Sequence, residues 1–284
     1  MIKIGRQNKL KITKEVQFGV YLDGGDFGEI LLPKKYIPKD LKADNEIEVF
    51  VYFDSEDRIV ATTEKPYAAI GEFAYLKTVS VTKIGAFLDW GLTKDLFVPF
   101  KEQRQKMIKG HSYIVYIYYD KKSDRIAGSS KLDKFFSKWP PEYEAGESVD
   151  LLIWNETELG FNAIVNNSHR GLLYKNELFQ PLLTGQKIKG FVNKIREDGK
   201  IDLTLQKPGY DKVSGLAEKI LEELKRHNGF IAVTDKTSPE KIHTIFGVSK
   251  KTYKKAAGAL YKKRLISIEK NGIRLKKKDI RKKK

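Results

Sequence analysis

The side chains that most often perform catalysis are few in this chain and poorly placed for it. There is no cysteine, and the four histidines have no metal-ligand spacing among them: His111, His169, His227 and His243. Two pairs of acidic residues could suggest a metal-dependent nuclease: Asp23/Asp26 and Asp54/Asp57. Both pairs fall in turns between expected strands, where Asp is common because its side chain hydrogen-bonds to the turn backbone. No glycine-rich phosphate loop and no H-E-x-x-H motif occurs. We therefore expect no catalytic residue, no metal site and no cofactor.

Basic side chains, by contrast, are concentrated in one part of the chain. The formal net charge is +17, and residues 211–284 hold 22 Lys and Arg against 8 Asp and Glu, which accounts for +14. This asymmetry predicts contact with a polyanion. The candidate contacts are Lys250, Lys251, Tyr253, Lys254, Lys255, Tyr261, Lys262, Lys263, Arg264, Lys270 and Arg274, followed by the tail KKKDIRKKK (276–284). A solvated lysine face is the alternative interpretation. Because lysine reads base edges poorly, we expect phosphate contact more than sequence recognition.

These basic residues need a scaffold, and the pattern predicts one. The segment 214–229 begins at a serine cap, ends at Gly229 and places four apolar residues on one helical stripe: Leu216, Ile220, Leu221 and Leu224. Ser238 and Pro239 predict the start of a short second helix. Ser249 caps a third helix over 250–264, with Ala256, Ala257 and Leu260 toward the core. The segment LISIEKNGIRL (265–275) predicts a hairpin, so the whole is typical of a winged helix.

The first three quarters of the chain contain one unit three times. Gly5, Gly71 and Gly146 open the copies, and a second glycine follows fourteen residues later in each: Gly19, Gly85 and Gly160. Apolar stretches recur at 29–33, 95–99 and 170–174, and closing strands at 56–63, 123–130 and 198–205. About five short strands per copy predict a small closed barrel.

The expected fold is therefore mainly β with a C-terminal α+β part. It comprises three tandem five-stranded OB-type barrels followed by a winged-helix domain. The expected domain bounds are 1–66, 67–139, 140–210 and 211–284.

The repeated motif resembles a known family. The sequence G-x-F-L-D, the following L-F-V-P and the closing D-R-I-A-G-S-S are similar to the OB-type S-one domain, an RNA-binding barrel. The resemblance implies that aromatic residues just before and two after the second glycine lie on the nucleic-acid face, joined by a position at the end of strand three. In this chain those positions hold Phe18, Tyr21 and Pro33; Ile84, Phe87 and Pro99; and Leu159, Asn162 and Tyr174. The prolines and the third copy depart from the family pattern. The implied RNA-binding residues are therefore Phe18, Tyr21, Phe87 and Tyr174.

Three such barrels and a C-terminal winged helix, over essentially the whole chain, resemble the conserved virulence factor B (CvfB/YitL) family. That resemblance implies single-stranded RNA binding and post-transcriptional regulation of bacterial gene expression, including virulence genes in pathogens. Two alternatives stay open. One is a DNA-binding transcriptional regulator that uses the winged helix. The other is a scaffold that contacts the ribosome or RNA-decay proteins, favoured by the near-neutral first and third copies (11 positive against 12 negative residues, and 8 against 10).

The chain shows no segment that would place it in or across a membrane. The N-terminal residues have no apolar run of signal-peptide length, and no window approaches 18 consecutive apolar residues. The absence of cysteine fits a reducing compartment. We expect a cytoplasmic protein whose partner is nucleic acid rather than a membrane.

Overall fold

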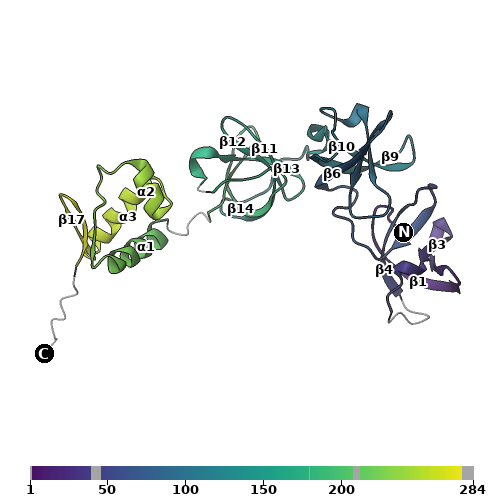
Figure 1. Ribbon diagram of the computed structural model, residues 1–284, viewed down its shortest axis with the longest axis horizontal. Coiled ribbons are helices and arrows are strands. Elements are labelled where there is room, and N and C mark those ends of the chain that lie inside the picture. The colour runs from purple at the N-terminus through teal and green to yellow at the C-terminus, as the bar shows by residue number, and fades with distance from the viewer. Residues whose placement is uncertain (1, 40–45, 179, 207–211, 277–284) are drawn as a thin grey trace. The chain divides into compact units, whose positions relative to one another are not determined.

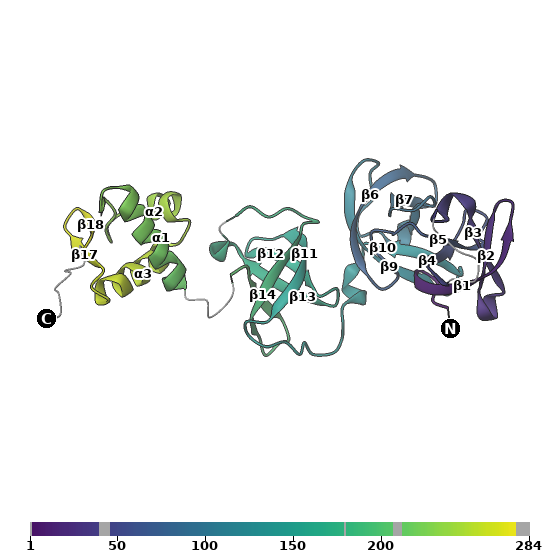
Figure 2. The ribbon, with the colours of Figure 1, turned by 90° about the horizontal axis from the view of Figure 1, so that it is seen from below.

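The computed structural model describes residues 2–39, 46–178, 180–206 and 212–276. It shows three closed barrels followed by a small domain of helices and strands, so the expected fold class is confirmed (Figures 1 and 2). The chain divides into two compact units. The first comprises residues 1–139 with the short segments 166–169 and 184–186, and the second comprises 140–165, 170–183 and 187–284.

The three barrels share one topology. The strands of barrel one are β1 (Arg6–Val16), β2 (Gly19–Asp23), β3 (Glu29–Pro33), β4 (Glu46–Phe53) and β5 (Ile59–Thr62). Those of barrel two are β6 (Phe73–Val81), β7 (Gly85–Asp89), β8 (Leu96–Pro99), β9 (Ser112–Asp120) and β10 (Arg125–Ser129). Those of barrel three are β11 (Ser148–Glu156), β12 (Gly160–Val165), β13 (His169–Tyr174), β14 (Lys187–Ile195) and β15 (Ile201–Thr204). In each barrel the third and fifth strands pair in parallel and close the sheet.

The repeated glycine at the start of the second strand is required by the close approach of the third strand. A Cβ atom built on Gly19, Gly85 or Gly160 would collide with the backbone carbonyl oxygen of Leu32, Val98 or Leu173, respectively. A backbone oxygen inside a paired strand cannot move aside as a flexible side chain can. The sequence repeat is therefore first a barrel-building signal.

A second feature recurs in every barrel and was not expected from the sequence: a β-bulge in the first strand. The pairing of the first and second strands shifts register once in every barrel, between Ile12 and Lys14, between Thr78 and Ser80, and between Ile153 and Asn155. Such a bulge bends a strand sharply and adds twist, which a five-stranded barrel needs in order to close. The extra residues are Thr13, Val79 and Trp154.

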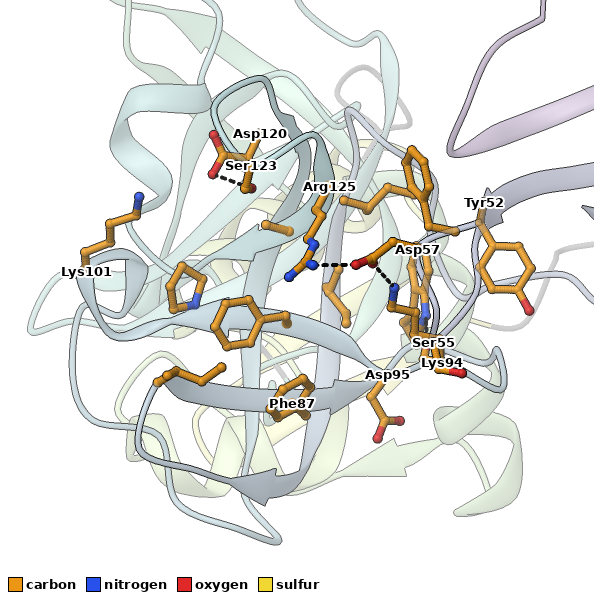
Figure 3. Close-up of a pocket in the computed structure, with 18 residues that line it drawn as sticks. Tyr52, Ser55, Asp57, Phe87, Lys94, Asp95, Lys101, Asp120, Ser123 and Arg125 are labelled. Atoms are coloured by element: carbon orange, nitrogen blue, oxygen red, sulfur yellow. Dashed lines mark hydrogen bonds and ion pairs between the residues drawn. The ribbon is translucent and has the colours of Figure 1, made fainter. Parts of the chain in front are cut away.

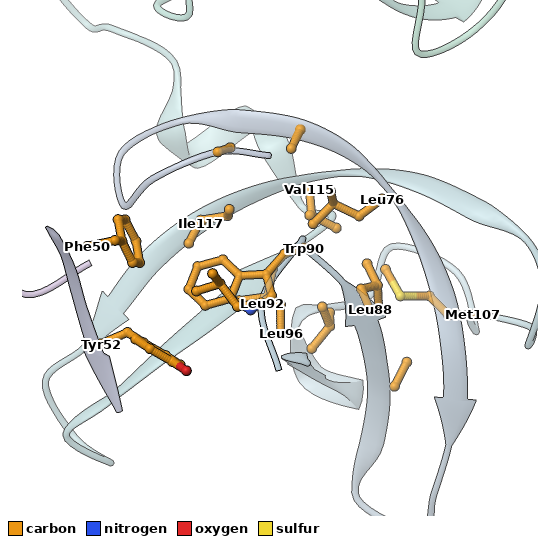
Figure 4. Close-up of a cluster of buried hydrophobic side chains, with 14 of the residues drawn as sticks. Phe50, Tyr52, Leu76, Leu88, Trp90, Leu92, Leu96, Met107, Val115 and Ile117 are labelled. Atoms are coloured by element: carbon orange, nitrogen blue, oxygen red, sulfur yellow. The ribbon is translucent and has the colours of Figure 1, made fainter. Parts of the chain in front are cut away.

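Barrels one and two share part of their core. Phe50 and Tyr52 of β4 are buried in the same apolar cluster as Leu88, Trp90 and other barrel-two residues (Figure 4). The Phe50 and Trp90 rings meet edge to face with their centroids 5.9 Å apart. The first compact unit is thus a packed pair of barrels rather than two separate ones.

The C-terminal domain has the winged-helix elements that the pattern predicts. Its helices are α1 (Lys212–Arg226), α2 (Pro239–Phe246) and α3 (Lys250–Lys262), and its wing strands are β17 (Ile266–Glu269) and β18 (Gly272–Leu275). The hydroxyls of Ser238 and Ser249 accept hydrogen bonds from the Lys241 and Thr252 backbone N–H groups, as expected for N-caps.

Two details of this domain differ from expectation. Helix α1 begins at Lys212, two residues before Ser214, so the cap expected at Ser214 is wrong; serine is common at N-caps, but here it lies inside the helix. A two-residue strand, β16 (Phe230–Ile231), pairs with β18 and was not expected, because two residues carry no periodic signal.

Candidate nucleic-acid interface

The outward face of β2 and β3 in barrel one carries an apolar platform. Phe18 directly precedes β2 and is 58% exposed, and half-buried Tyr21 meets it edge to face with ring centroids 6.4 Å apart. Strand alternation explains the placement, because Val20 and Leu22 point into the barrel while Tyr21 points out. Leu31 lies opposite Tyr21 on β3 and extends the platform. The structure thus brings together both residues that the resemblance assigns to this barrel.

The equivalent face of barrel two has a different pair of rings. Ile84 is 64% exposed, and half-buried Phe87 packs against Phe97 with the centroids 5.1 Å apart. Phe97 lies directly opposite Phe87 in the β7–β8 ladder. Sequence reasoning missed Phe97. Its signal was available: it alternates with Leu96 and Val98, which are buried, on a strand expected to pair with the strand of Phe87.

A pocket of about 340 Å³ covers this second platform. Figure 3 shows the β7–β8 face on one side and the turn between β4 and β5 of barrel one on the other. Asp57 in that turn forms ion pairs with Arg125 and, at 3.0 Å, with Lys94. Lys94, whose ammonium donates to the Asp57 carboxylate, and Arg125 together lower the pKa of Asp57. The turn is therefore held against barrel two by an acid that stays ionised at neutral pH.

One acid of each pair bonds to its own turn, as expected. Asp23 accepts a hydrogen bond of 2.9 Å from the backbone N–H of Gly25, and Asp54 accepts one of 2.9 Å from that of Glu56. Across the described part of the chain, no group of three His, Asp or Glu residues could hold a metal ion.

Barrel three presents a different surface. Leu159 is 67% exposed, but Asn162 is half-buried and donates to Asn155 at 3.2 Å. The Tyr174 hydroxyl contacts the Arg196 guanidinium and donates at 3.2 Å to Asp202, which is buried. The predicted contact residue Tyr174 is therefore already held in a polar network.

Barrel three also has a stacked pair that sequence reasoning missed. The bulge residue Trp154 on β11 lies under the Arg170 guanidinium of β13, which is 5.4 Å from the ring centroid. The signal was weak, because neither residue occupies a position that the other two copies fill with an aromatic. This stack gives barrel three an aromatic surface outside the second strand.

In the winged helix, α3 presents its charge away from the core. Tyr253, Ala256, Ala257 and Leu260 face inward, and at 100° per residue Lys251, Lys255 and Lys262 lie on the opposite side. Tyr261 is 52% exposed, and Lys254, Lys255, Lys263, Arg264 and Lys270 are exposed as well, while Lys250 is half-buried. The predicted basic face is brought together on one helix and its flanks.

Three of the expected contacts are engaged within the domain. Tyr253 is 2% exposed, and its hydroxyl donates to the Val233 carbonyl at 3.2 Å, so its assignment to the surface is wrong. The reason is helical phase, because Tyr253 shares the stripe of Ala256, Ala257 and Leu260. Arg274 pairs with Glu269 at 2.8 Å and lies 4.8 Å from the centroid of the Phe230 ring. The Lys254 ammonium lies 3.9 Å from the Asp235 carboxylate. The tail beyond Lys276 lies outside the described residues.

Known families match both parts of this arrangement. A model of the S1 domain matches residues 4–64 and 70–129, and a model of the CvfB-like winged helix domain matches residues 218–275. Together these matches span more than half of the chain. The chain belongs to the CvfB family.

Relatives of the CvfB family match this chain over most of its length and of theirs. The protein YitL of Bacillus subtilis (strain 168) is 28% identical over 274 residues, which cover 91% of this chain and 89% of YitL. Conserved virulence factor B of Staphylococcus epidermidis is 23% identical over 273 residues, covering 93% and 92% of the two chains. A crystal structure from Streptococcus pneumoniae, described as a multidomain protein with nucleic acid binding domains, is 23% identical, covers 96% and 98%, and has a TM-score of 0.44.

The N-terminus of α3 carries an electrostatically unfavourable feature. Its first turn contains Lys250 and Lys251 and no acidic residue, although the positive end of a helix dipole favours acids there by about 0.3–1 kcal/mol each. Helix-turn-helix domains place the N-terminal residues of their recognition helix against DNA. S1 and winged-helix domains are nucleic-acid-binding rather than enzymatic, so this CvfB-family chain binds nucleic acid. No helix among its described residues is long and apolar enough to cross a membrane.

Proposed function

We propose that this protein is a non-catalytic, cytoplasmic regulator that binds single-stranded RNA and controls gene expression after transcription. The observation that carries the proposal is the repeated platform: an exposed side chain before the second strand and an aromatic two residues after its glycine, at Phe18 and Tyr21 and again at Ile84 and Phe87.

The chemistry of the platforms favours unpaired bases. Bases stacked on exposed rings contribute about 1–3 kcal/mol each with little sequence preference, but bases in a duplex are already stacked on one another. The lysines of α3 supply the complementary charge, since each phosphate that they neutralise releases a counterion. The platforms thus supply selectivity for single strands, and the winged helix supplies electrostatic affinity.

A duplex-DNA function of the winged helix is the second candidate, favoured by the three lysines directly opposite the core of α3. One experiment separates the two. The intact chain and the variant Phe18→Ala/Tyr21→Ala/Phe87→Ala are titrated with single-stranded RNA, single-stranded DNA and duplex DNA of equal length. The matched control is Phe27→Ala/Tyr67→Ala, which removes two exposed rings, 45% and 59% exposed, outside the platforms.

RNA should bind best, and the triple variant should lose at least about tenfold in affinity with an unchanged salt slope, because rings neutralise no phosphates. The control should bind like the parent chain. Strongest binding to duplex DNA, with an indifferent triple variant, would establish the second candidate instead.

A further inference from the structure

The pocket on barrel two has charged side chains of opposite sign at its two ends, in addition to the aromatic rings on which a base can stack. Asp95, Phe97 and Pro99 alternate along the β8 segment of its lining, and Lys101 follows in the 3-10 turn Phe100–Glu102. Residues two apart on an extended chain lie about 7 Å from each other on the same face. Figure 3 shows Asp95 and Lys101 toward opposite ends of the pocket, with Phe87 between them. The lining therefore presents an anion, a pair of aromatic rings and a cation in sequence.

Only one of the three carboxylates in the pocket lining is free to accept a ligand. Asp57 is paired with Lys94 and Arg125. Asp120 accepts hydrogen bonds from the Lys122 backbone N–H at 3.1 Å and the Ser123 hydroxyl at 3.0 Å. Asp95 accepts no hydrogen bond and forms no ion pair with any residue that the structure describes, although it is half-buried.

The surroundings of Asp95 disfavour its charged form, as expected for a carboxylate that lacks hydrogen-bond donors. Burial, with a smaller contribution from the Asp89 carboxylate, raises the pKa of Asp95. A partly desolvated carboxylate without a partner is costly, and charge-assisted hydrogen bonds from a ligand remove that cost. Lys101 at the other end is exposed and has no ion pair within the described chain, so it is available for a phosphate.

We propose that this pocket holds one guanine nucleotide of the bound RNA, with the base stacked on Phe87 and Phe97 and its edge at Asp95. The inference rests on the proposed RNA-binding function. Guanine is the base that offers two adjacent donors, the N1–H and the N2 amino group, to the two oxygens of one carboxylate. Adenine and cytosine pair one amino group with a neighbouring acceptor, and uracil offers a single N–H. The sugar–phosphate then runs toward Lys101. The turn of barrel one closes the far wall, so the site needs both barrels.

The test compares oligouridine RNAs that differ only at one central base, which is guanine, inosine, adenine, cytosine or uracil. Inosine lacks only the N2 amino group of guanine. The intact chain should bind the guanine strand about tenfold more tightly than the inosine strand, since a bidentate contact discriminates by about 1–3 kcal/mol. Asp95→Asn, whose amide places a donor where a carboxylate oxygen accepts, should reduce that ratio to within about twofold.

Two further variants keep the outcomes distinct. Asp26→Asn removes the same charge from an exposed turn outside the pocket and should retain the full ratio. Lys101→Ala should weaken every strand alike and reduce the salt slope by about 0.7, the amount for one phosphate. Equal binding of guanine and inosine strands by the intact chain, or an unchanged ratio in Asp95→Asn, would overturn the guanine site and leave RNA binding standing. Failure of all five strands to bind would overturn both.

Discussion

The three lysines that point directly away from the core of α3 allow a quantitative test of the electrostatic contact. Lys251, Lys255 and Lys262 lie within about 40° of one another around the helix axis, so one nucleic-acid backbone can meet all three. For a single strand, the logarithm of affinity falls with the logarithm of salt concentration by about 0.7 per phosphate neutralised. The variant Lys251→Ala/Lys255→Ala/Lys262→Ala should therefore have a slope shallower by about 2.1.

That difference is large enough to measure. A rise from 50 to 200 mM salt is fourfold, so the intact chain should lose about 18-fold more affinity than the variant over this step. The assay is fluorescence anisotropy with a labelled single-stranded RNA at four or more salt concentrations. Alanine favours helix more than lysine does, so the substitutions should not unfold α3.

The matched control removes the same charge from the same domain. Lys219→Ala/Lys225→Ala/Lys236→Ala changes three exposed lysines outside α3, none of which forms an ion pair with the described residues. If α3 contacts the backbone, this control should keep most of the parent slope. Equal slope changes in the two triple variants would refute the reasoning, because they would show diffuse attraction by net charge rather than a contact.

Three further predictions concern the scaffold. Gly85→Ala should destabilise barrel two by about 3 kcal/mol or more, because the added Cβ collides with the backbone. Gly110→Ala has open space at its Cβ and should cost only the strain of its positive φ, about 1–2 kcal/mol. Calorimetry measures the unfolding of both variants. Tyr253→Phe should lower winged-helix stability by about 1 kcal/mol and leave RNA affinity unchanged, measured by thermal melting and anisotropy; a loss of affinity would contradict its placement in the core. The pKa of Asp57 is lowered by Lys94 and Arg125, so these pairs add stability above pH 3.8 that is lost as the pH falls through the folded-state pKa. The free energy of unfolding of Asp57→Asn should therefore depend less on pH in this acid range than that of the parent chain. Identical dependence of unfolding on pH in the two proteins would contradict the coupling.

The architecture was predictable because its signals are local. The repeated glycines fix a strand start at the same place in each copy, and the caps at Ser238 and Ser249 fix two helix starts. The barrel closure then follows from strand number and spacing. The family resemblance stated from these motifs is confirmed by the matching S1 and winged-helix models.

The interface was predicted less completely because it depends on contacts across strands and between barrels. Phe97 gains its role only from its register opposite Phe87. The pairing of Asp57 with Arg125 joins residues far apart in the chain, which no short motif records. Tyr253 shows the converse error, since a tyrosine among lysines resembles a surface contact until the helical phase is fixed by the packed core.

The shared core of the first two barrels also has a consequence for synthesis on the ribosome. Strand β4 leaves the ribosome with Phe50 and Tyr52, but the ring that packs on Phe50 belongs to Trp90. At about 5–20 residues per second, the intervening stretch takes about 2–8 s to make. During that interval Phe50 and Tyr52 of barrel one lack the barrel-two side chains that bury them, and barrel two covers them once it has been made.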